Sequence, residues 1–462
     1  MSLFIPDYIG QYLCLPKLFF GSVLCIGVAG FGVPADAQSD SGVGLQEVLA
    51  AVYASDPRLN AERARILVRS ESLTQARFEY RPRVDLEARA GYGSQATRFS
   101  SSPSAQVDGL EFDVGITVLQ PVFRGFRRKN KVARLESEVE AQRLRLVEVS
   151  RAIFLDTAKL YFEILLAERQ VESAIEREAL ANEQFGVAKA KDEAGVKSGF
   201  DTALFELELA SARTNLVSKR ARLTLLEDQL RRRAGLVAVD LKPNPSLPEM
   251  PRDLGDFLGE VYQSSASIKR AEADLRAAIH AVSESKATYY PSVDIELTAG
   301  RDSGSVNFGL FTDDQTTESL RASIKGTVPL YTGGQRSSSV RKAKHSESTA
   351  RYNLAVEKLQ VEESARQLWL AFKQTENIFE AQRQRRQLAE RAADRGAARH
   401  ASGVISLSEL LSVQEELYDS RTRYDEAMRD RHVAAWAVVA QTDFLDLEAV
   451  ISEETGVETD HD

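Results

Sequence analysis

Polar and apolar residues alternate along four short stretches of the chain. In PRVDLEARAGY (82–92), charged side chains from Arg83 to Arg89 alternate with apolar or small ones. In LEFDVGITVL (110–119), the apolar residues fall on one face and the polar residues on the other. A period of two is typical of β-strands, because successive side chains point to opposite faces. We therefore expect strands at about 83–93, 110–120, 292–301 and 319–328.

Two explanations of this alternation remain open from the strands alone. One is an antiparallel sheet that is half-buried on a soluble core. The other is a barrel in lipid, with apolar side chains outside and ions toward a water-filled lumen. A strand of about ten residues suits a tilted membrane crossing. Single-chain barrels start at about eight strands, so four strands per chain would need several copies to close one.

The rest of the chain has the three- and four-residue apolar spacing of helices. Residues 44–79 predict a helix broken near Asp56 and Pro57. Between Arg127 and Ala194 there is no proline, and a continuous helix over this stretch would be about 100 Å long. The stretch 335–401 has the same character. Helices of this length need lateral partners, so we expect a coiled coil or a helical barrel.

The pattern occurs twice, which indicates an internal duplication. YRPRVDLE (80–87) returns as YYPSVDIE (289–296), and QPVFRGFRR (120–128) returns as VPLYTGGQR (328–336). AGVKSGFD (194–201) returns as SGVISLSE (402–409). We therefore divide the chain into a first repeat, a proline-rich linker, a second repeat and an acidic tail that we expect to be disordered. Their ranges are 38–235, 236–253, 254–445 and 446–462, with hairpin tips near 195–201 and 403–408.

The N-terminus predicts export from the cytoplasm. Lys17 precedes an apolar run that ends at Ala35-Asp36-Ala37, which is typical of a secretory signal peptide over residues 1–37. The chain's two cysteines lie within it, so we expect a mature chain without disulfides, thiolate catalysis or cysteine-bound metal. The net charge of -9 argues against bulk nucleic-acid binding.

Enzymatic function is not indicated. The sequence contains no glycine-rich phosphate loop, no HExxH motif and no Cys/His cluster, and its five histidines are scattered. We expect no catalytic residues, no metal and no cofactor.

These features together resemble the TolC family of trimeric outer-membrane channels. The resemblance spans nearly the whole mature chain and depends on the order, duplication and spacing of motifs that are individually loose. They are AVYASDPRLNAERA (51–64), the two strand motifs, LQPVFRGFRR with VPLYTGGQR, and the hairpin tips AGVKSGFDTALFELELASART and SGVISLSELLSVQEELYDSRT.

The resemblance implies an α+β membrane protein in the outer membrane of Gram-negative cells. Three chains would each give four strands to a twelve-stranded transmembrane β-barrel, continuous with a periplasmic coiled-coil barrel. The homotrimer would be a passive exit duct for secreted polypeptides or small toxic compounds. A periplasmic adaptor (membrane fusion) protein and an inner-membrane ABC or RND-type transporter would be its partners, and outer-membrane lipid would surround it. The competing class is a periplasmic adaptor or scaffold, but that class needs a single hairpin, whereas here the hairpin is duplicated.

The resemblance also indicates functional residues at the hairpin tips. It places Glu409 at a pore constriction, with Asp201 as its counterpart in the first repeat. Ser412 stands where some relatives have a second acid, so the constriction would be weaker. The patterns SLSE and SGFD also fit a helix-capping box, in which the acid only satisfies backbone donors. Gly195, Val196, Gly403 and Val404 are the expected contacts with the partner proteins.

Cations crowd the start of each long helix, where they oppose the helix dipole. In the first repeat they are Arg127, Arg128, Lys129 and Lys131, and in the second Arg336, Arg341, Lys342 and Lys344. Lipid headgroup anchoring and a solvated charged surface are both open explanations. Phe123 and Tyr331, just before the clusters, would suit an aromatic girdle or packing at the joint between strand and helix.

Overall fold

The computed structural model describes residues 42–99, 102–194, 199–235, 241–242, 246–307 and 312–442. Of residues 94–99, 102–109, 201, 305–307 and 312–315 it describes the backbone alone. The described residues belong to one compact unit. The predicted signal peptide and acidic tail lie outside them.

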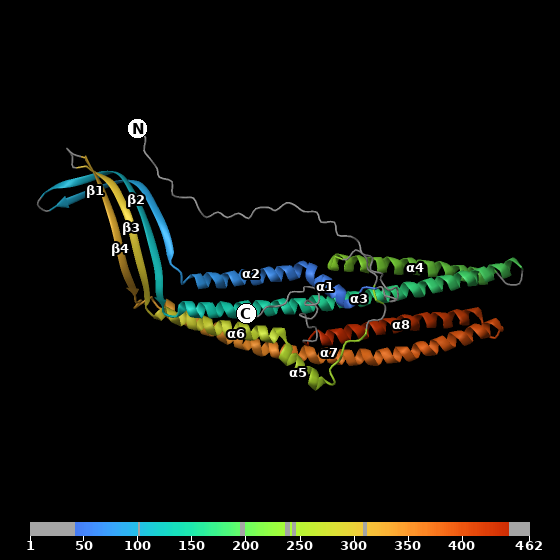
Figure 1. The fold of residues 1–462 in the computed structure, drawn as a ribbon. Helices are drawn as coiled ribbons and strands as arrows, with labels where there is room; N and C mark the ends of the chain where they lie inside the picture. The colour runs from blue at the N-terminus through green and yellow to red at the C-terminus, as the bar shows by residue number, and fades with distance from the viewer. Residues whose placement is uncertain are drawn as a thin grey trace, which may run out of the picture. The chain divides into compact units, whose positions relative to one another are not determined.

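A single antiparallel sheet contains four strands in the order β1-β2-β3-β4 (Figure 1). Its central pairing, β2 with β3, joins the two repeats, with Thr117 opposite Thr298. Among the described strands, β1 pairs with β2 alone and β4 with β3 alone, so both are edges. The strands run beyond the ten residues that the alternation predicts, because the ladder continues into the polar ends. Their bounds are β1 Arg83–Phe99, β2 Ser102–Arg124, β3 Ser292–Asn307 and β4 Thr312–Thr327.

The helices also occur in two matching sets. The first set is α1 (Leu45–Ser55), α2 (Pro57–Phe78), α3 (Arg127–Glu193) and α4 (Gly199–Ala234). The second is α5 (Leu254–Ser264), α6 (Ala266–Lys286), the 3-10 turn η1 (Ala287–Tyr289), α7 (Gln335–Ala401) and α8 (Leu407–Val439). Both α3 and α7 contain 67 residues.

The breaks between the short helices have a local cause. Pro57 lacks an N–H group and begins α2, which is the helical position where proline is tolerated. Asp56 caps this helix, because its carboxylate accepts the N–H of Arg58 at 2.7 Å. Ser265 caps α6 in the equivalent place, accepting the N–H of Ile268 at 3.3 Å. Each repeat therefore enters its strands through two helices in tandem, the second of which is capped by a side chain.

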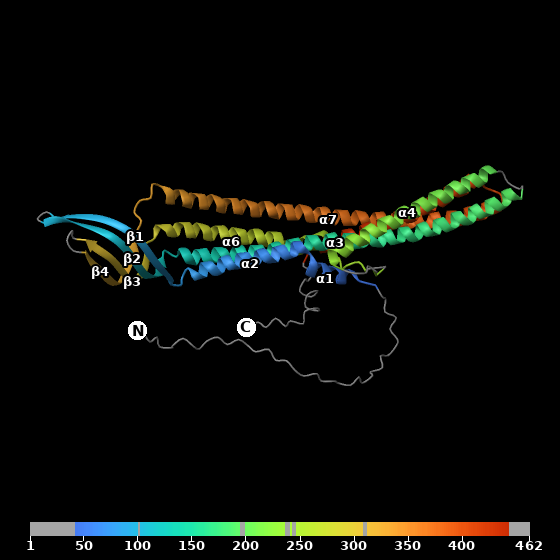
Figure 2. The same cartoon turned by 90° about the horizontal axis from the view of Figure 1, so that it is seen from above.

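The long helices form two hairpins, α3 with α4 and α7 with α8, which extend away from the sheet (Figures 1 and 2). α3 is central, since it contacts α1, α2, α4, α6 and α8. α7 contacts α5, α6 and α8. Among the described residues, no helix is both long and apolar enough to cross a membrane.

Two hydrophobic clusters fix the hairpins at mid-length. In the first, Tyr161 on α3 is fully buried and its hydroxyl donates to the carbonyl of Lys242 at 3.1 Å. In the second, Phe257 on α5 stacks on Trp369 of α7 at 5.7 Å between ring centres. The proline-rich linker contributes to both, with Leu241 in the first cluster and Leu247 against the second.

Candidate functional site

One face of the sheet is apolar and exposed. Leu86 on β1 lies opposite Ile116 on β2, and Ile295 on β3 lies opposite Ile324 on β4. Leu86 is 69% exposed and Ile324 is 76% exposed. Contiguous exposed apolar surface of this kind indicates an interaction with a protein or a membrane.

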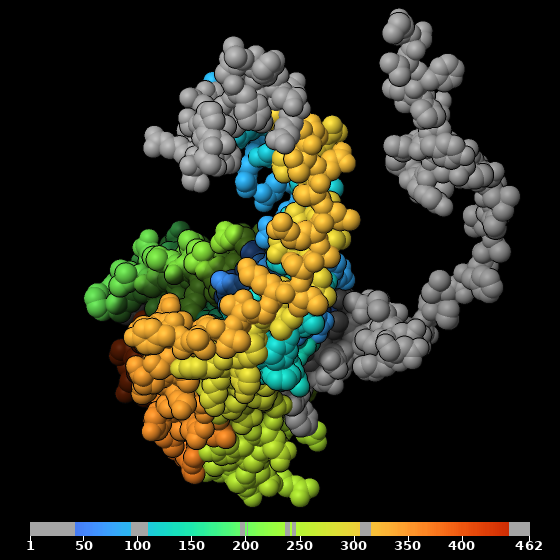
Figure 3. Space-filling model, turned by 90° about the vertical axis from the view of Figure 1, so that its left-hand side faces the viewer, coloured from blue at the N-terminus to red at the C-terminus, as the bar shows by residue number. Residues whose placement is uncertain are grey.

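The opposite face is ionic. Arg83 pairs with Asp85 at 2.8 Å and Arg89 pairs with Glu87 at 3.1 Å, both along β1. The described helices lie beyond one end of the sheet and cover neither face (Figure 1), and the yellow and orange strands rise clear of the helical part in Figure 3. The described part of the chain therefore places no hydrophobic core against either face of this sheet, which argues against the half-buried sheet on a soluble core as the explanation for the alternation.

The joint between β2 and α3 is a tight, aromatic turn. Gly125 has φ +60°, and a Cβ there would lie 2.6 Å from the carbonyl oxygen of Ala287, so the position requires glycine. Phe126 follows in the left-handed region at φ 63°. Phe123 packs edge-on against Phe126 at 5.4 Å between ring centres, whereas Tyr331 in the second repeat is 88% exposed.

At the second hairpin tip, Glu409 forms a capping box with Ser406. The Ser406 N–H donates to the Glu409 carboxylate at 2.7 Å, and the Glu409 N–H donates to the Ser406 hydroxyl at 3.3 Å. These bonds to Ser406 hold the pKa of Glu409 below its usual value. The side chain is nevertheless exposed. The capping interpretation of SLSE therefore holds in the single chain, and a role in the pore stays a prediction.

The other predicted tip residues divide into described and undescribed ones. Gly403, at φ +75°, ends α7 with its N–H donating to the carbonyl of His400 at 2.9 Å. Val404 follows and is 60% exposed, and Ser412 is exposed on α8. Asp201 lies in the first turn of α4, with its side chain outside the described part. Gly195 and Val196 lie outside the described residues.

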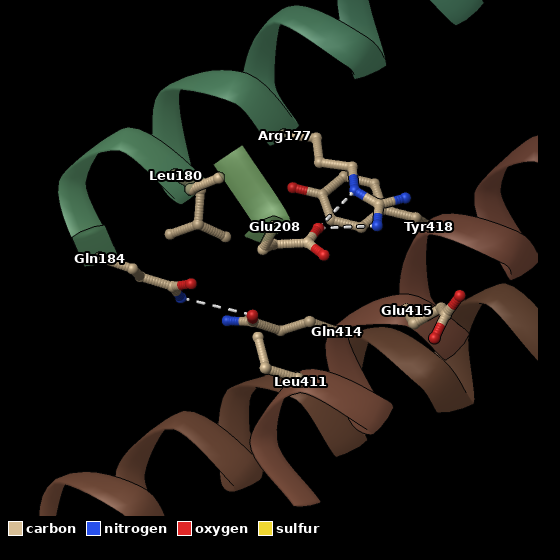
Figure 4. A pocket seen from close by; sticks show the side chains of 9 residues that line it. Arg177, Leu180, Gln184, Glu208, Leu411, Gln414, Glu415 and Tyr418 are labelled. Atoms are coloured by element: carbon tan, nitrogen blue, oxygen red, sulfur yellow. Dashed lines mark hydrogen bonds and ion pairs between the residues drawn. The ribbon is translucent and has the colours of Figure 1, made fainter. Parts of the chain in front are cut away.

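Just behind the tips, polar side chains link the two hairpins around a cavity of about 80 Å³ (Figure 4). Arg177 of α3 donates to Glu208 of α4 at 2.8 Å, and its guanidinium lies 5.2 Å from the ring centre of Tyr418 on α8. Gln184 of α3 donates to Gln414 of α8 at 3.3 Å. These residues lie in long helical stretches without a local motif, so the sequence does not indicate them.

Ion pairs continue this link between α3 and α8 toward the middle of the hairpins. Glu176 pairs with Arg421 at 3.2 Å, and Glu163 pairs with Arg429. Exposed ion pairs contribute little to stability, but opposite charges that face each other favour this alignment of α3 with α8 over a shifted one. The two hairpins of one subunit are therefore held in a defined alignment.

A sheet that is exposed on both faces and continuous with two long helical hairpins defines one subunit of a trimeric outer-membrane channel. The chain belongs to the outer membrane efflux protein family, whose model matches residues 48–236 and 257–441. The family is one of channels rather than enzymes. Membership places the strands in the outer membrane and the helical tunnel in the periplasm, and it decides against the adaptor class.

Individual relatives agree with this assignment. The chain is 24% identical over 400 residues to the outer membrane efflux protein BepC of Brucella suis, covering 86% of this chain and 85% of BepC. It is 27% identical over 317 residues to the protein CyaE of Bordetella pertussis, covering 66% and 63%.

Solved structures share the fold at low sequence identity. The CmeC outer membrane channel of Campylobacter jejuni superposes with a TM-score of 0.72 at 14% identity, over 95% of this chain and 98% of CmeC. The outer membrane protein VceC of Vibrio cholerae gives 0.69 at 17% identity, over 86% and 95%.

Proposed function

We propose that this channel is the passive exit duct of a three-part export system. A periplasmic adaptor and an inner-membrane transporter of ABC or RND type deliver its cargo, which is a secreted polypeptide or a small toxic compound. The observation that carries the proposal is the sheet, which has one apolar face, one ionic face and two unpaired edges. Three copies joined from β4 to β1 satisfy both edges and enclose an aqueous passage.

The periplasmic end of the tunnel is narrowed by the Glu409 carboxylates of three subunits, with Asp201 contributing from the first repeat. A ring of carboxylates in a narrow passage attracts cations and repels anions. The capping box does not prevent this role, since the Glu409 side chain remains exposed. Ser412 adds no charge, so the constriction on α8 has one acid per subunit. Gly195, Val196, Gly403 and Val404 meet the adaptor at the turns.

The two roles of Glu409 can be separated by a matched pair of variants. Glutamine also completes a capping box, so Glu409→Gln removes the charge and keeps the cap. Ser406→Ala removes the cap and keeps the charge. Reversal potentials of single channels in planar bilayers measure cation selectivity, and thermal unfolding measures the cap.

We expect Glu409→Gln to lower cation selectivity at unchanged thermal stability. Ser406→Ala should lower thermal stability at unchanged cation selectivity. A Glu409→Gln channel with the selectivity of the wild type would remove Glu409 from the constriction. A wild-type protein that forms no pores in the bilayer would contradict the proposal that the trimer is an exit duct.

A further inference from the structure

An open pocket of about 730 Å³ lies where the sheet joins the helices in the first repeat. It is formed by the end of α2, the start of β1, the end of β2 and the start of α3. Its charge is strongly positive, because five arginines and a single carboxylate, Glu79, line it. The arginines are Arg81, Arg83, Arg124, Arg127 and Arg128.

Two of these arginines are neutralised within the fold. Arg83 pairs with Asp85 at 2.8 Å, and Arg124 pairs with Asp294 at 2.7 Å. The carboxylate of Glu79 does not neutralise the remaining arginines, because it pairs with Lys131, which lies outside the pocket lining.

The other three guanidinium groups have no carboxylate partner in the described part of the chain. Arg81 lies over the ring of Phe78 at 4.2 Å, and Arg127 is exposed at the start of α3. Arg128 is only 6% exposed and lies 4.8 Å from the ring centre of Tyr80. Burial, together with the neighbouring Arg124, lowers the pKa of Arg128. The carboxylates that act on Arg128 from a distance, Glu79 and Asp294, are each paired with another cation. A buried cation with no carboxylate of its own is costly, so the pocket favours an added anion.

The start of α3 adds backbone donors to the same place. The N-cap residue, Phe126, provides no side-chain cap, and the first turn contains no acid. The first N–H groups of a helix have no intrahelical partner and favour an anion. This end therefore combines backbone donors with the unpaired guanidinium of Arg128.

The second repeat lacks this arrangement. The positions equivalent to Arg81, Arg83, Arg124 and Arg127 are the neutral residues Tyr290, Ser292, Thr332 and Gln335. The equivalent of Arg128 is Arg336, which donates to the carbonyl of Pro329 at 2.7 Å. The shared joint therefore does not require the extra arginines, and they need another explanation.

The strand register shows which side the pocket faces. Arg83 and Leu119 are opposite each other and both alternate with apolar-face residues, so they lie on the ionic face. Asp294, the partner of Arg124, alternates with Val293 and Ile295 and lies on that face too. In the channel this face borders the aqueous passage, whereas the opposite face meets lipid.

We propose that this arginine pocket binds an anion bearing a phosphate or carboxylate group from the aqueous passage, once per subunit. Planar guanidinium groups match the oxygen pairs of both anions. The proposal concerns binding at the joint and does not depend on the cargo or on the partner proteins. It explains Arg127 and Arg128 of the basic cluster in the first repeat by a site on the aqueous side instead of by lipid headgroup anchoring.

The test uses inorganic pyrophosphate as the probe and the purified trimer in nanodiscs of zwitterionic lipid. A ligand that binds the folded state raises the unfolding temperature in proportion to its occupancy. At constant ionic strength, we expect pyrophosphate but not chloride to raise the Tm of the wild type in a saturable way. Arg81→Tyr with Arg127→Gln, which introduces the second-repeat residues, should remove most of this rise.

Two further features make the result decisive. Lys129→Gln removes a nearby exposed charge that does not line the pocket, and it should keep the full rise. In chloride, the double variant should be at least as stable as the wild type, since it relieves repulsion. An equal pyrophosphate effect in the double variant and the wild type, or no effect in the wild type, would overturn the proposal.

Whether the bound anion is instead a lipid headgroup is tested by repeating the titration in nanodiscs that contain phosphatidylglycerol. An aqueous site gives the same pyrophosphate effect in both lipids. If phosphatidylglycerol alone raises the Tm and pyrophosphate adds nothing, the site holds a lipid headgroup and the assignment to the passage is wrong.

Discussion

The helices α3 and α7 are equivalent in the duplicated chain and equal in length, but their surroundings differ. Phe162 on α3 is 2% exposed, because α8 covers it and His432 stacks on it at 5.1 Å. The equivalent residue on α7, Leu370, is 64% exposed. The difference shows that α3 lies inside the subunit, whereas α7 lies at its boundary.

The exposed apolar residues of α7 follow the spacing of one helix face. Tyr352, Val356 and Leu359 are four and three residues apart and are 71%, 50% and 67% exposed. Exposed apolar residues also occur on α2 and α4, including Leu67 and Val217. In a trimer each boundary helix meets a neighbouring subunit, so we expect the α7 face to be covered there. Substitutions in the buried face of α3 and in the exposed face of α7 therefore distinguish an effect on folding of the subunit from an effect on assembly of the trimer.

The largest effect is expected from a charge on the α7 face. Leu359→Glu would bury an unpaired carboxylate between subunits, which is costly enough to prevent assembly. Unboiled gel electrophoresis should show loss of the trimer band. Gln360→Glu, on an adjacent exposed position, should leave the trimer intact. A stable Leu359→Glu trimer would mean that this face is not an interface.

A smaller effect is expected from a cavity in α3. Ile153 is 2% exposed within the first cluster, so Ile153→Ala should reduce the free energy of unfolding by about 2–5 kcal/mol. Its equivalent on α7, Val361, is partly buried, and Val361→Ala should cost about 1 kcal/mol. Denaturant unfolding measures both. Equal losses would show that α7 is packed as tightly as α3 within the folded assembly.

The smallest effect concerns pH at the contact of α3 with α8. Burial, with Arg431 and Arg169, lowers the pKa of His432 to about 4. In the unfolded chain this histidine binds its proton near pH 6.5. The contribution of neutral His432 to the free energy of unfolding is therefore fully present above pH 6.5 and is lost as the pH falls toward 4. Between pH 7 and pH 5 the loss is less than about 2 kcal/mol, because partial exposure screens the charge.

His432→Phe keeps the stacked ring and removes the titration. Its midpoint of urea unfolding should change less between pH 7 and pH 5 than that of the wild type. Identical changes in the two proteins would assign the acid sensitivity to other groups.

The sequence predicts the architecture because its periodicities are local. The alternation around Leu86 and Ile295 predicts strands, and the structure places these residues in β1 and β3 of a four-stranded sheet. The proline-free stretch after Arg127 predicts the long helix that the structure shows as α3. SLSE predicts the cap at Glu409, since a capping box spans only four residues.

The sites formed by distant residues could not be predicted in this way. Gln184 and Gln414 meet only because two hairpins align, and neither residue is distinctive in its helix. Arg81 and Arg128 line one pocket because β1 and β2 return the chain to the same joint. The sequence shows the basic cluster at 127–131, but it does not show which cations the fold leaves without a counter-ion.

The pairing of β2 with β3 has a consequence for symmetry. The hydrogen-bonded seam between the two halves of one polypeptide has the same antiparallel form as the seam needed between neighbouring polypeptides. Three chains therefore form a ring of six similar repeats, in which every second pair of neighbouring repeats belongs to the same polypeptide. Because two repeats are fused in one chain they can diverge, so that a feature acquired by one repeat occurs three times around the ring instead of six.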